Sequence, residues 1–247
     1  MSPAASLEAQ ARTFAEELTA TVSALAPTVS AFRARALSAG DRERFAVTQE
    51  PDTGVPLLVE GEPLLTLKVR YECALDGVKR YLAIDESDVK VYAGPKAAGE
   101  PLFRYHYRRA SRGDLPSAHL HIHAHRDATT YVMASAGDAT RRGKRRARSS
   151  DVPHLYEMHF PLGGHRFRPC LEDFLEMLVV ELGVDSSAEG LESLRAGREE
   201  WRRKQLRSVV RDDAGEAADV LRGMGYEVRW RRKGPVPERH PSRRRDF

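Results

Sequence analysis

Four histidines occupy every second position from His119 to His125, within the segment "SAHLHIHAHRD", residues 117–127. Alternate side chains of a β-strand point to the same face about 6–7 Å apart, so two of these imidazoles can reach one metal ion while all four cannot. The spacing favours His121 with His123, or His119 with His121, and leaves the outer histidines as flanks. The segment therefore predicts a strand that carries a metal site, an acid–base site or only an unusual composition.

A metal site needs further donors, and the segment "HLYEMHF", residues 154–160, offers two on one face of a predicted strand, Glu157 and His159. Imidazole and carboxylate donors together suit Zn, Mn, Fe or Ni. We therefore expect a divalent metal ion, Zn or Mn, as the candidate cofactor. Its predicted ligands are His121, His123, Glu157 and His159.

The same histidines could act without a metal, because imidazole titrates near neutrality and a pair can serve as base and acid together. Arginines on the same face could bind a phosphate and stabilise the charge that develops on it. Cleavage of RNA by its own 2′-hydroxyl requires little more than these groups. The candidate catalytic residues are His106, His121, His123 and His159, and the candidate substrate-binding residues are Lys68, Arg70, Arg104 and Arg108.

These side chains fall in a long region, from about residue 43 to residue 161, where apolar and polar residues alternate with a period of two. "LLTLKVRYECAL" is the clearest strand, and Asp76-Gly77 is a two-residue turn signal for a hairpin into "VKRYLAID". "DVKVYAG", "PLFRYHYRR", "HLHIHAH" and "HLYEMHF" predict further strands. In an antiparallel sheet with one buried face, all apolar sets point to one side and all polar sets share the other. The core side of the histidine strand is then Leu120, Ile122 and Ala124.

Helical spacing appears on both sides of this region. Apolar residues recur at steps of three and four over residues 6–25, and a second short helix is expected over 28–37. The strongest helix prediction covers 171–182, with Pro169 near its start and Gly183 at its end. Two more helices, the first strongly basic, are expected over 188–223.

The predicted fold class is therefore α+β, with a central antiparallel β-sheet covered on one face by helices and with helical additions at both ends. The expected organisation is an N-terminal helical segment (1–42), a sheet-plus-helix core domain (43–184), a basic helical extension (185–232) and a disordered basic tail (233–247).

Composition restricts the class of protein. The chain has 247 residues, 41% hydrophobic and 31% charged, which is typical of a globular protein with a highly charged surface. It has no apolar run long enough for a membrane span, and its acidic N-terminus is unlike a signal peptide, so we expect a cytoplasmic protein without membrane contact. Cys73 and Cys170 form no metal or disulfide spacing, so both are expected to be buried free thiols.

Basic residues are concentrated rather than spread. The run "RRGKRRAR", residues 141–148, has six basic residues in eight positions, and the C-terminal tail repeats the pattern. Such runs suit an anionic partner through counterion release, and they also suit a solvated loop and tail. Nucleic acid, RNA in particular, is the candidate partner that follows from the first interpretation.

The segment "LFRYHYRR", followed by "PSAHLHIHAHR" and preceded by the hairpin around Asp76-Gly77, resembles the TumE type of toxin from two-gene toxin–antitoxin pairs. The resemblance covers residues 64–125, about a quarter of the chain. It implies a toxin-like activity on RNA and a cognate antitoxin as protein partner. The functional set that it carries over is Arg104, His106, Arg108, His121 and His123. The flanking helices, the second His/Glu segment and the basic extensions depart from that pattern.

Three functional hypotheses follow. The first is a phosphodiesterase or ribonuclease-like, toxin-like enzyme that uses the histidine- and arginine-lined face of the sheet. The second is a metal-binding enzyme that acts on a small molecule through His and Glu ligands. The third is a noncatalytic module that binds nucleic acid or a protein partner.

Overall fold

The computed structural model describes residues 6–26, 31–37, 43–77, 79–110, 115–124, 152–163 and 165–231, together with residues 130, 144–145, 148 and 233–234. Most of the basic run 141–148, nearly all of the C-terminal tail and His125 lie outside the described residues. In the part that is described, no helix has the length and apolar character needed to cross a membrane.

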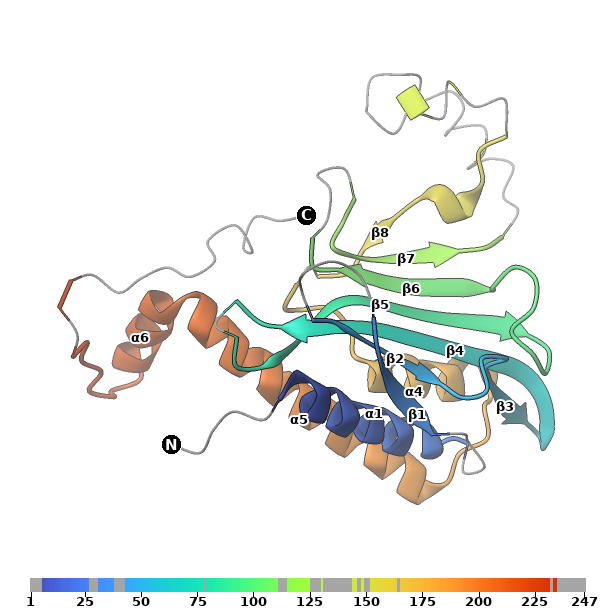
Figure 1. The fold of residues 1–247 in the computed structure, drawn as a ribbon, viewed down its shortest axis with the longest axis horizontal. Helices are drawn as coiled ribbons and strands as arrows, with labels where there is room; N and C mark the ends of the chain where they lie inside the picture. Colours follow the sequence, from blue (N-terminus) through green and yellow to red (C-terminus); the bar gives the residue numbers. More distant parts are fainter. Residues whose placement is uncertain are drawn as a thin grey trace.

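One antiparallel sheet organises the described chain (Figure 1). Its strands follow the order β1-β2-β4-β5-β6-β7-β8, and β3 pairs with β4 beside the end of β2. The long β4–β5 hairpin forms the centre, and β6 and β7 extend the sheet toward the histidine strand. The strands are β1 (Phe32–Ala36), β2 (Phe45–Gln49), β3 (Val55–Val59), β4 (Glu62–Leu75), β5 (Leu82–Ala93), β6 (Phe103–Arg108), β7 (Ala118–Ile122) and β8 (Phe160–Pro161).

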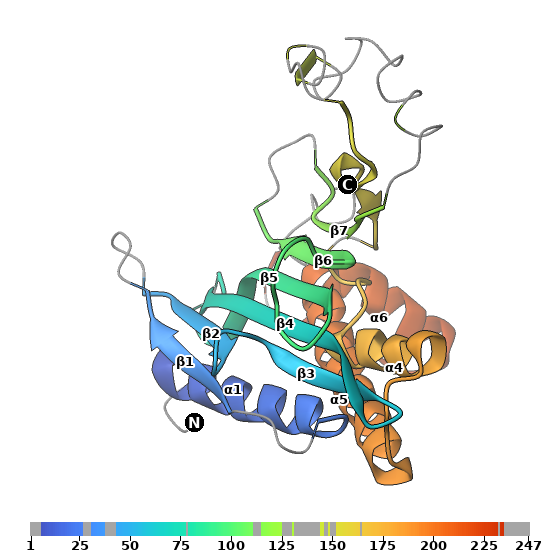
Figure 2. The same cartoon turned by 90° about the vertical axis from the view of Figure 1, so that its right-hand side faces the viewer.

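Helices lie on one side of this sheet, as Figure 2 shows. α1 packs under β1 and β2, α5 runs beside α1 and α4, and α6 follows α5 at its far end. A short 3-10 helix, η1, precedes β8 at the opposite end of the molecule. The elements are α1 (Leu7–Ser23), η1 (Leu155–Glu157), α4 (Leu171–Leu182), α5 (Ala188–Asp212) and α6 (Ala214–Gly223). The predicted α+β class, with helical additions at both ends, is confirmed.

The core forms between the inner face of the sheet and α1, α4 and α5. Alternate residues of β4 are buried on this face as the sequence pattern predicts, and they meet the apolar stripes of the helices. Residues with no exposed surface include Leu67, Leu175, Leu178 and Leu194. Both cysteines are buried and free, as expected, and burial raises the pKa of the Cys73 thiol to about 12. Both ends of the chain therefore contribute to the same core as the central sheet.

The start of α4 is fixed by a reciprocal cap. Asp173 accepts a hydrogen bond from the Cys170 amide at 3.1 Å, and Arg198 and Arg202 of α5 form ion pairs with the same carboxylate. Burial raises the pKa of Asp173, but the hydrogen bonds from Cys170 and the two positive charges outweigh this, and the net pKa lies below its ordinary value. Gly183 ends the helix in the left-handed conformation, as predicted.

We expect Asp173→Asn to lower the free energy of unfolding by about 1 kcal/mol at pH 7, because the charged acceptor is lost while the side chain still fits. A carboxyl whose pKa is lowered by folding contributes stability above its unfolded pKa, and this contribution is lost as the pH falls through the folded pKa. Urea unfolding of both proteins between pH 7 and pH 3 should therefore show a difference that shrinks in acid. A difference that stays constant with pH would contradict the role of the charge.

The helix predicted over residues 28–37 is wrong, because Phe32–Ala36 form strand β1. Pairing with β2 places Phe32 in the core opposite Gln49, and the Phe32 amide donates to Thr19 of α1 at 2.9 Å. Pairing with a neighbouring strand thus overrides a weak local helical pattern. The N-terminal segment 1–42 is consequently part of the sheet and not only helical.

Two further local predictions are corrected. The β4–β5 hairpin closes at Leu75 opposite Leu82, so its loop is longer than the predicted two-residue turn, and the Asp76 carboxylate accepts from the amides of Arg80 and Tyr81. The segment 154–160 is not one strand, because η1 interrupts it and only Phe160–Pro161 join the sheet. The turn changes which side chains of this segment share a face.

The outermost strands are short. β1 carries Arg33 and Arg35, which both pair with Glu50. β8 has two residues and ends at Pro161, which lies opposite His119. β7 and β8 lie at the edge of the sheet away from α1 (Figures 1 and 2).

Candidate metal centre

Strand register arranges the polar face of the sheet, opposite the helices, in rows that cross β4, β5, β6 and β7. Side chains of one row are direct neighbours on adjacent strands. The first row is Lys68, Lys90, Arg104 and His121; the second is Arg70, Asp88, His106 and His119; the third is Glu72, Glu86 and Arg108. The ends of the first and second rows therefore place His121, His106 and His119 next to one another on β6 and β7.

Three of these histidines converge. His106 Nδ1 lies 3.2 Å from His119 Nε2, and one ring nitrogen each of His106, His119 and His121 lies within 4.8 Å of those of the other two. The ring centroids of His106 and His119 are 5.0 Å apart, and those of His119 and His121 are 4.9 Å apart. This group is called the histidine cluster below.

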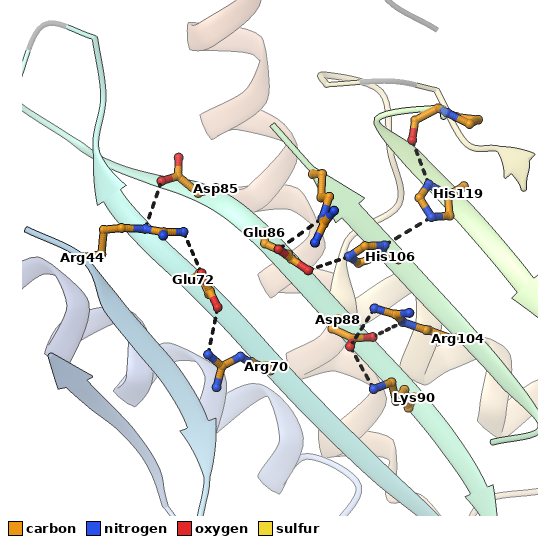
Figure 3. Close-up of polar contacts among 12 residues, drawn as sticks. Arg44, Arg70, Glu72, Asp85, Glu86, Asp88, Lys90, Arg104, His106 and His119 are labelled. Atoms are coloured by element: carbon orange, nitrogen blue, oxygen red, sulfur yellow. Dashed lines mark hydrogen bonds and ion pairs between the residues drawn. The ribbon is translucent and has the colours of Figure 1, made fainter. Parts of the chain in front are cut away.

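The second nitrogen of each ring in the histidine cluster has an acceptor beside it. His119 Nδ1 lies 2.8 Å from the Pro116 carbonyl, His121 Nδ1 contacts the Tyr156 carbonyl, and His106 Nε2 lies 2.8 Å from a Glu86 oxygen (Figure 3). A carbonyl or carboxylate oxygen only accepts, so the nitrogen that faces it carries the proton. In a neutral imidazole the other nitrogen then presents a lone pair. For His106 and His119 these second nitrogens face each other, and one ring nitrogen of His121 lies within 4.8 Å of the other two histidines' donors.

Burial keeps these imidazoles neutral. His106, His119 and His121 are 6%, 2% and 9% exposed. Burial lowers the pKa of His119 to about 4, and the hydrogen bond to Pro116 offsets only part of this effect. Burial also lowers the pKa of His106 and of His121. Neutral imidazole is the form that binds a metal ion.

His159 lies beside the histidine cluster without belonging to its three converging donors, and its predicted role as a ligand or catalytic group stays a prediction. Its ring centroid is 4.6 Å from that of His119 and 4.4 Å from that of His121. Its Nδ1 lies 2.9 Å from the Glu157 carbonyl, which fixes that nitrogen as a donor. The loop after η1 thus brings a fourth ring to the site.

Glu157 does not belong to the three converging donors, so its assignment as a metal ligand stays a prediction. Its carboxylate accepts a hydrogen bond from the His154 amide at 2.9 Å and caps η1. The reason is the turn itself, because a 3-10 helix needs this acceptor at its first amides while a strand would have presented the side chain to the sheet face.

His123 is also outside the histidine cluster, in contrast to the predicted pair of His121 with His123. β7 ends at Ile122, so the strand alternation that would align His123 with His121 stops there. His123 instead contacts Glu100 at 2.7 Å and stacks on Tyr156, with ring centroids 4.8 Å apart. The structure instead groups His121 with His119, which is the second of the two pairs that the spacing favoured.

Leu120, Ile122 and Ala124, in and just after β7, were predicted to be buried, and this prediction is wrong. Leu120 is half-buried, Ile122 is 37% exposed and Ala124 is exposed. His119 and His121 are more buried than Leu120 and Ile122, because the segment around η1 covers their side, whereas Ala118 at the start of β7 is fully buried. The predicted inner face is thus the more open one only toward the end of β7.

The predicted substrate-binding cations all lie on the polar face, and each has an acidic partner. Arg104 forms a two-point contact with Asp88 at 2.7 and 3.0 Å (Figure 3). The other pairs are Arg108 with Glu86, Arg70 with Glu72 and Lys68 with Asp52. Burial raises the pKa of Asp88, but the Arg104 and Lys90 contacts outweigh it and the net pKa is lowered.

Three polar side chains on β5 that the sequence did not single out also lie on this face: Glu86, Asp88 and Lys90. Their signal was present in "DESDVKV", where these residues alternate with Ser87, Val89 and Val91 of the core face. Glu86 has a direct place in the site, because it fixes the orientation of His106. Burial raises the pKa of Glu86, but the hydrogen bond from His106 and the positive charge of Arg108 outweigh this effect. The net pKa of Glu86 is therefore lowered.

Comparisons of the chain with protein-family models, with curated proteins and with solved structures found no match. The resemblance of residues 64–125 to TumE-type toxins therefore stays a prediction.

Proposed function

We propose that the chain binds one zinc-class ion through His106, His119 and His121 and uses it as the centre of a hydrolase. One observation carries this proposal: each ring has one nitrogen held by an oxygen acceptor, and the three buried rings bring one nitrogen each within 4.8 Å of one another. Metal-binding histidines almost always donate their second N–H to a carboxylate or a backbone carbonyl in this way.

The distances agree with this assignment. Two imidazole nitrogens bound tetrahedrally to zinc at about 2.1 Å lie roughly 3.4 Å apart. The 3.2 Å between His106 Nδ1 and His119 Nε2 is close to this value. One ring nitrogen of His121 lies within 4.8 Å of the ligand nitrogens of His106 and His119.

An all-imidazole donor set favours zinc over manganese, because manganese prefers carboxylate and water oxygens. The carboxylate of Glu86 acts through His106 and not directly on the ion. Three neutral ligands leave the full charge of the ion and a fourth position for water, whose pKa falls to about 7 on zinc. In ester hydrolysis, the hydroxide oxygen from this water would bond to the central atom of the ester. The bond from that atom to the ester oxygen would break, and the proton released by the water would go to the departing alcohol.

A metal-free ribonuclease is the weaker alternative. General acid–base catalysis needs an imidazole that can exchange a proton with the substrate. His106 Nε2 is held by Glu86 and His119 Nδ1 by the Pro116 carbonyl, and His119 is only 2% exposed. The burial of the histidine cluster and its hydrogen bonds to these oxygen acceptors support ligand roles better than proton exchange with a bound RNA.

Elemental analysis of protein purified without a histidine tag tests this function directly. We expect about one zinc ion per chain, or uptake of one equivalent when chelated protein is titrated with Zn²⁺, and weaker binding of Mn²⁺. A zinc content far below one ion per chain, together with no uptake of Zn²⁺, Mn²⁺ or Fe²⁺ on titration, would reject the metal centre.

A further inference from the structure

The first register row places three cations side by side and leads to the histidine cluster. Lys68 on β4 lies opposite Lys90 on β5, Lys90 lies opposite Arg104 on β6, and Arg104 lies opposite His121 on β7. Neighbouring strands are about 4.8 Å apart, so the three cations span roughly 10 Å and end beside a proposed metal ligand. Figure 3 shows Lys90 and Arg104 both in contact with the Asp88 carboxylate.

This row is costly as a purely structural arrangement. Like charges directly opposite each other on adjacent strands destabilise a sheet. Asp88 is shared by Lys90 and Arg104, and the remaining partner of the row, Asp52, is 86% exposed. The ion pair of Lys68 with such an exposed carboxylate contributes little and is easily replaced. Three positive charges therefore face two negative ones, which leaves a local charge of +1 before any metal is bound.

The charge of the polar face changes from acidic in the third row to basic in the first row. The third row has two acids, Glu72 and Glu86, and one cation, Arg108. The first row has cations alone together with His121. The side chains of Lys68, Lys90 and Arg104 are 32%, 29% and 29% exposed, so a ligand can reach them. An anion that approaches this face is attracted to the first row and to the ion at its end.

We propose that the row of Lys68, Lys90 and Arg104 binds the phosphate group of a phosphate ester and presents it to the ion. This inference rests on the proposed metal centre and names its substrate class. Lysine binds phosphate as a point charge, while Arg104, held at two points by Asp88, presents its remaining N–H groups in a fixed direction. In hydrolysis the ion-bound hydroxide oxygen bonds to phosphorus, the bond from phosphorus to the ester oxygen breaks, and the alcohol leaves with the proton.

The double variant Lys68→Gln with Lys90→Gln tests the row. Both side chains are partly exposed and neither touches the histidine cluster, so the fold and the zinc content should be unchanged. We expect the affinity of the zinc-loaded protein for inorganic phosphate, measured by calorimetry, to fall at least about tenfold, which is the loss expected for charge-assisted hydrogen bonds. The matched control is Arg33→Gln with Arg35→Gln on β1, which removes two charges elsewhere on the sheet and should leave phosphate binding unchanged.

Two further probes, a nucleoside monophosphate and a short single-stranded RNA, distinguish a small phosphorylated substrate from a polyanion. A nucleoside monophosphate that binds as tightly as a short single-stranded RNA indicates a small phosphorylated substrate, whereas much tighter, strongly salt-dependent binding of the RNA indicates a polyanion. Equal phosphate binding by the wild type and the lysine variant would overturn the inference. Zinc content is measured on the same samples. Zinc uptake without phosphate binding overturns only the phosphate-binding inference. Failure to take up zinc overturns both the metal centre and the phosphate-binding inference.

Discussion

Replacement of His119 by alanine is expected to abolish stoichiometric zinc binding, with an affinity loss of at least roughly 100-fold, since even outer-shell partners of zinc ligands are worth 10–100-fold. His119 is the central residue of the histidine cluster, because its ring contacts those of His106, His121 and His159. Zinc at about 1,000 times its Kd should stabilise the wild type by about 4 kcal/mol, or roughly 10 °C in Tm for a chain of this size. The His119→Ala protein should show no such shift.

The matched control is His123→Ala, which removes the neighbouring histidine of the same segment that contacts Glu100 and Tyr156 instead of the cluster. It should bind zinc like the wild type. If the two variants lose zinc equally, the site is not the one described.

Because His119 is fully buried, Glu86→Ala provides a milder second variant. It leaves the three ligands in place and removes the acceptor that orients His106, so zinc affinity should fall about 10- to 100-fold. Glu100→Ala removes the corresponding acceptor of His123 and should have no effect.

Gly190→Ala is expected to destabilise the protein by about 2 kcal/mol or more. Gly190 is the third residue of α5, and at an open helical position alanine would stabilise the helix by up to about 1 kcal/mol, since it is the better helix former. Here a Cβ at Gly190 would lie 2.2 Å from the Ala24 carbonyl oxygen, in the backbone that follows α1. Backbone cannot rotate away as a side chain can, so α5 must separate from α1, and overpacking of this kind costs about 1–3 kcal/mol in addition to the lost gain.

Gly215→Ala in α6 is the control, because the nearest heavy atom to its added Cβ is an Asp213 side-chain oxygen at 3.7 Å. Urea denaturation of both variants measures the difference. Gly215→Ala should match or slightly exceed the wild type in stability, and a Gly190→Ala protein as stable as the wild type would show that α1 and α5 do not approach as closely as described.

Regular elements with strong periodicity could be predicted from the sequence. The twofold alternation of β4 and the helical stripe of 171–182 both identify buried faces that the structure bears out. The 28–37 segment could not be assigned in this way, because its strand exists through pairing with β2 and not through its own pattern. Local pattern decides a segment only where tertiary pairing agrees with it.

The histidine site was predictable in its residue types but not in its membership. Strand parity correctly placed His106 and His121 on one face with Arg104. The inclusion of His119 and the exclusion of His123 depend on where β7 ends and on which carbonyls of residues 116 and 156 accept from the rings. Those backbone positions come from irregular segments, whose paths are set by contacts distant in the sequence.

The two short outer strands have a consequence for how copies of this chain meet one another. An outer strand offers unpaired amides and carbonyls to which another chain can add a strand, and this is a common route to aggregation. In the described sheet one border carries the charged Arg33 and Arg35, and the other is only two residues long and ends in a proline that has no amide to donate. These features discourage strand addition between molecules at β1 and at β8, and the histidine-bearing end of the sheet is kept from becoming a template for intermolecular pairing.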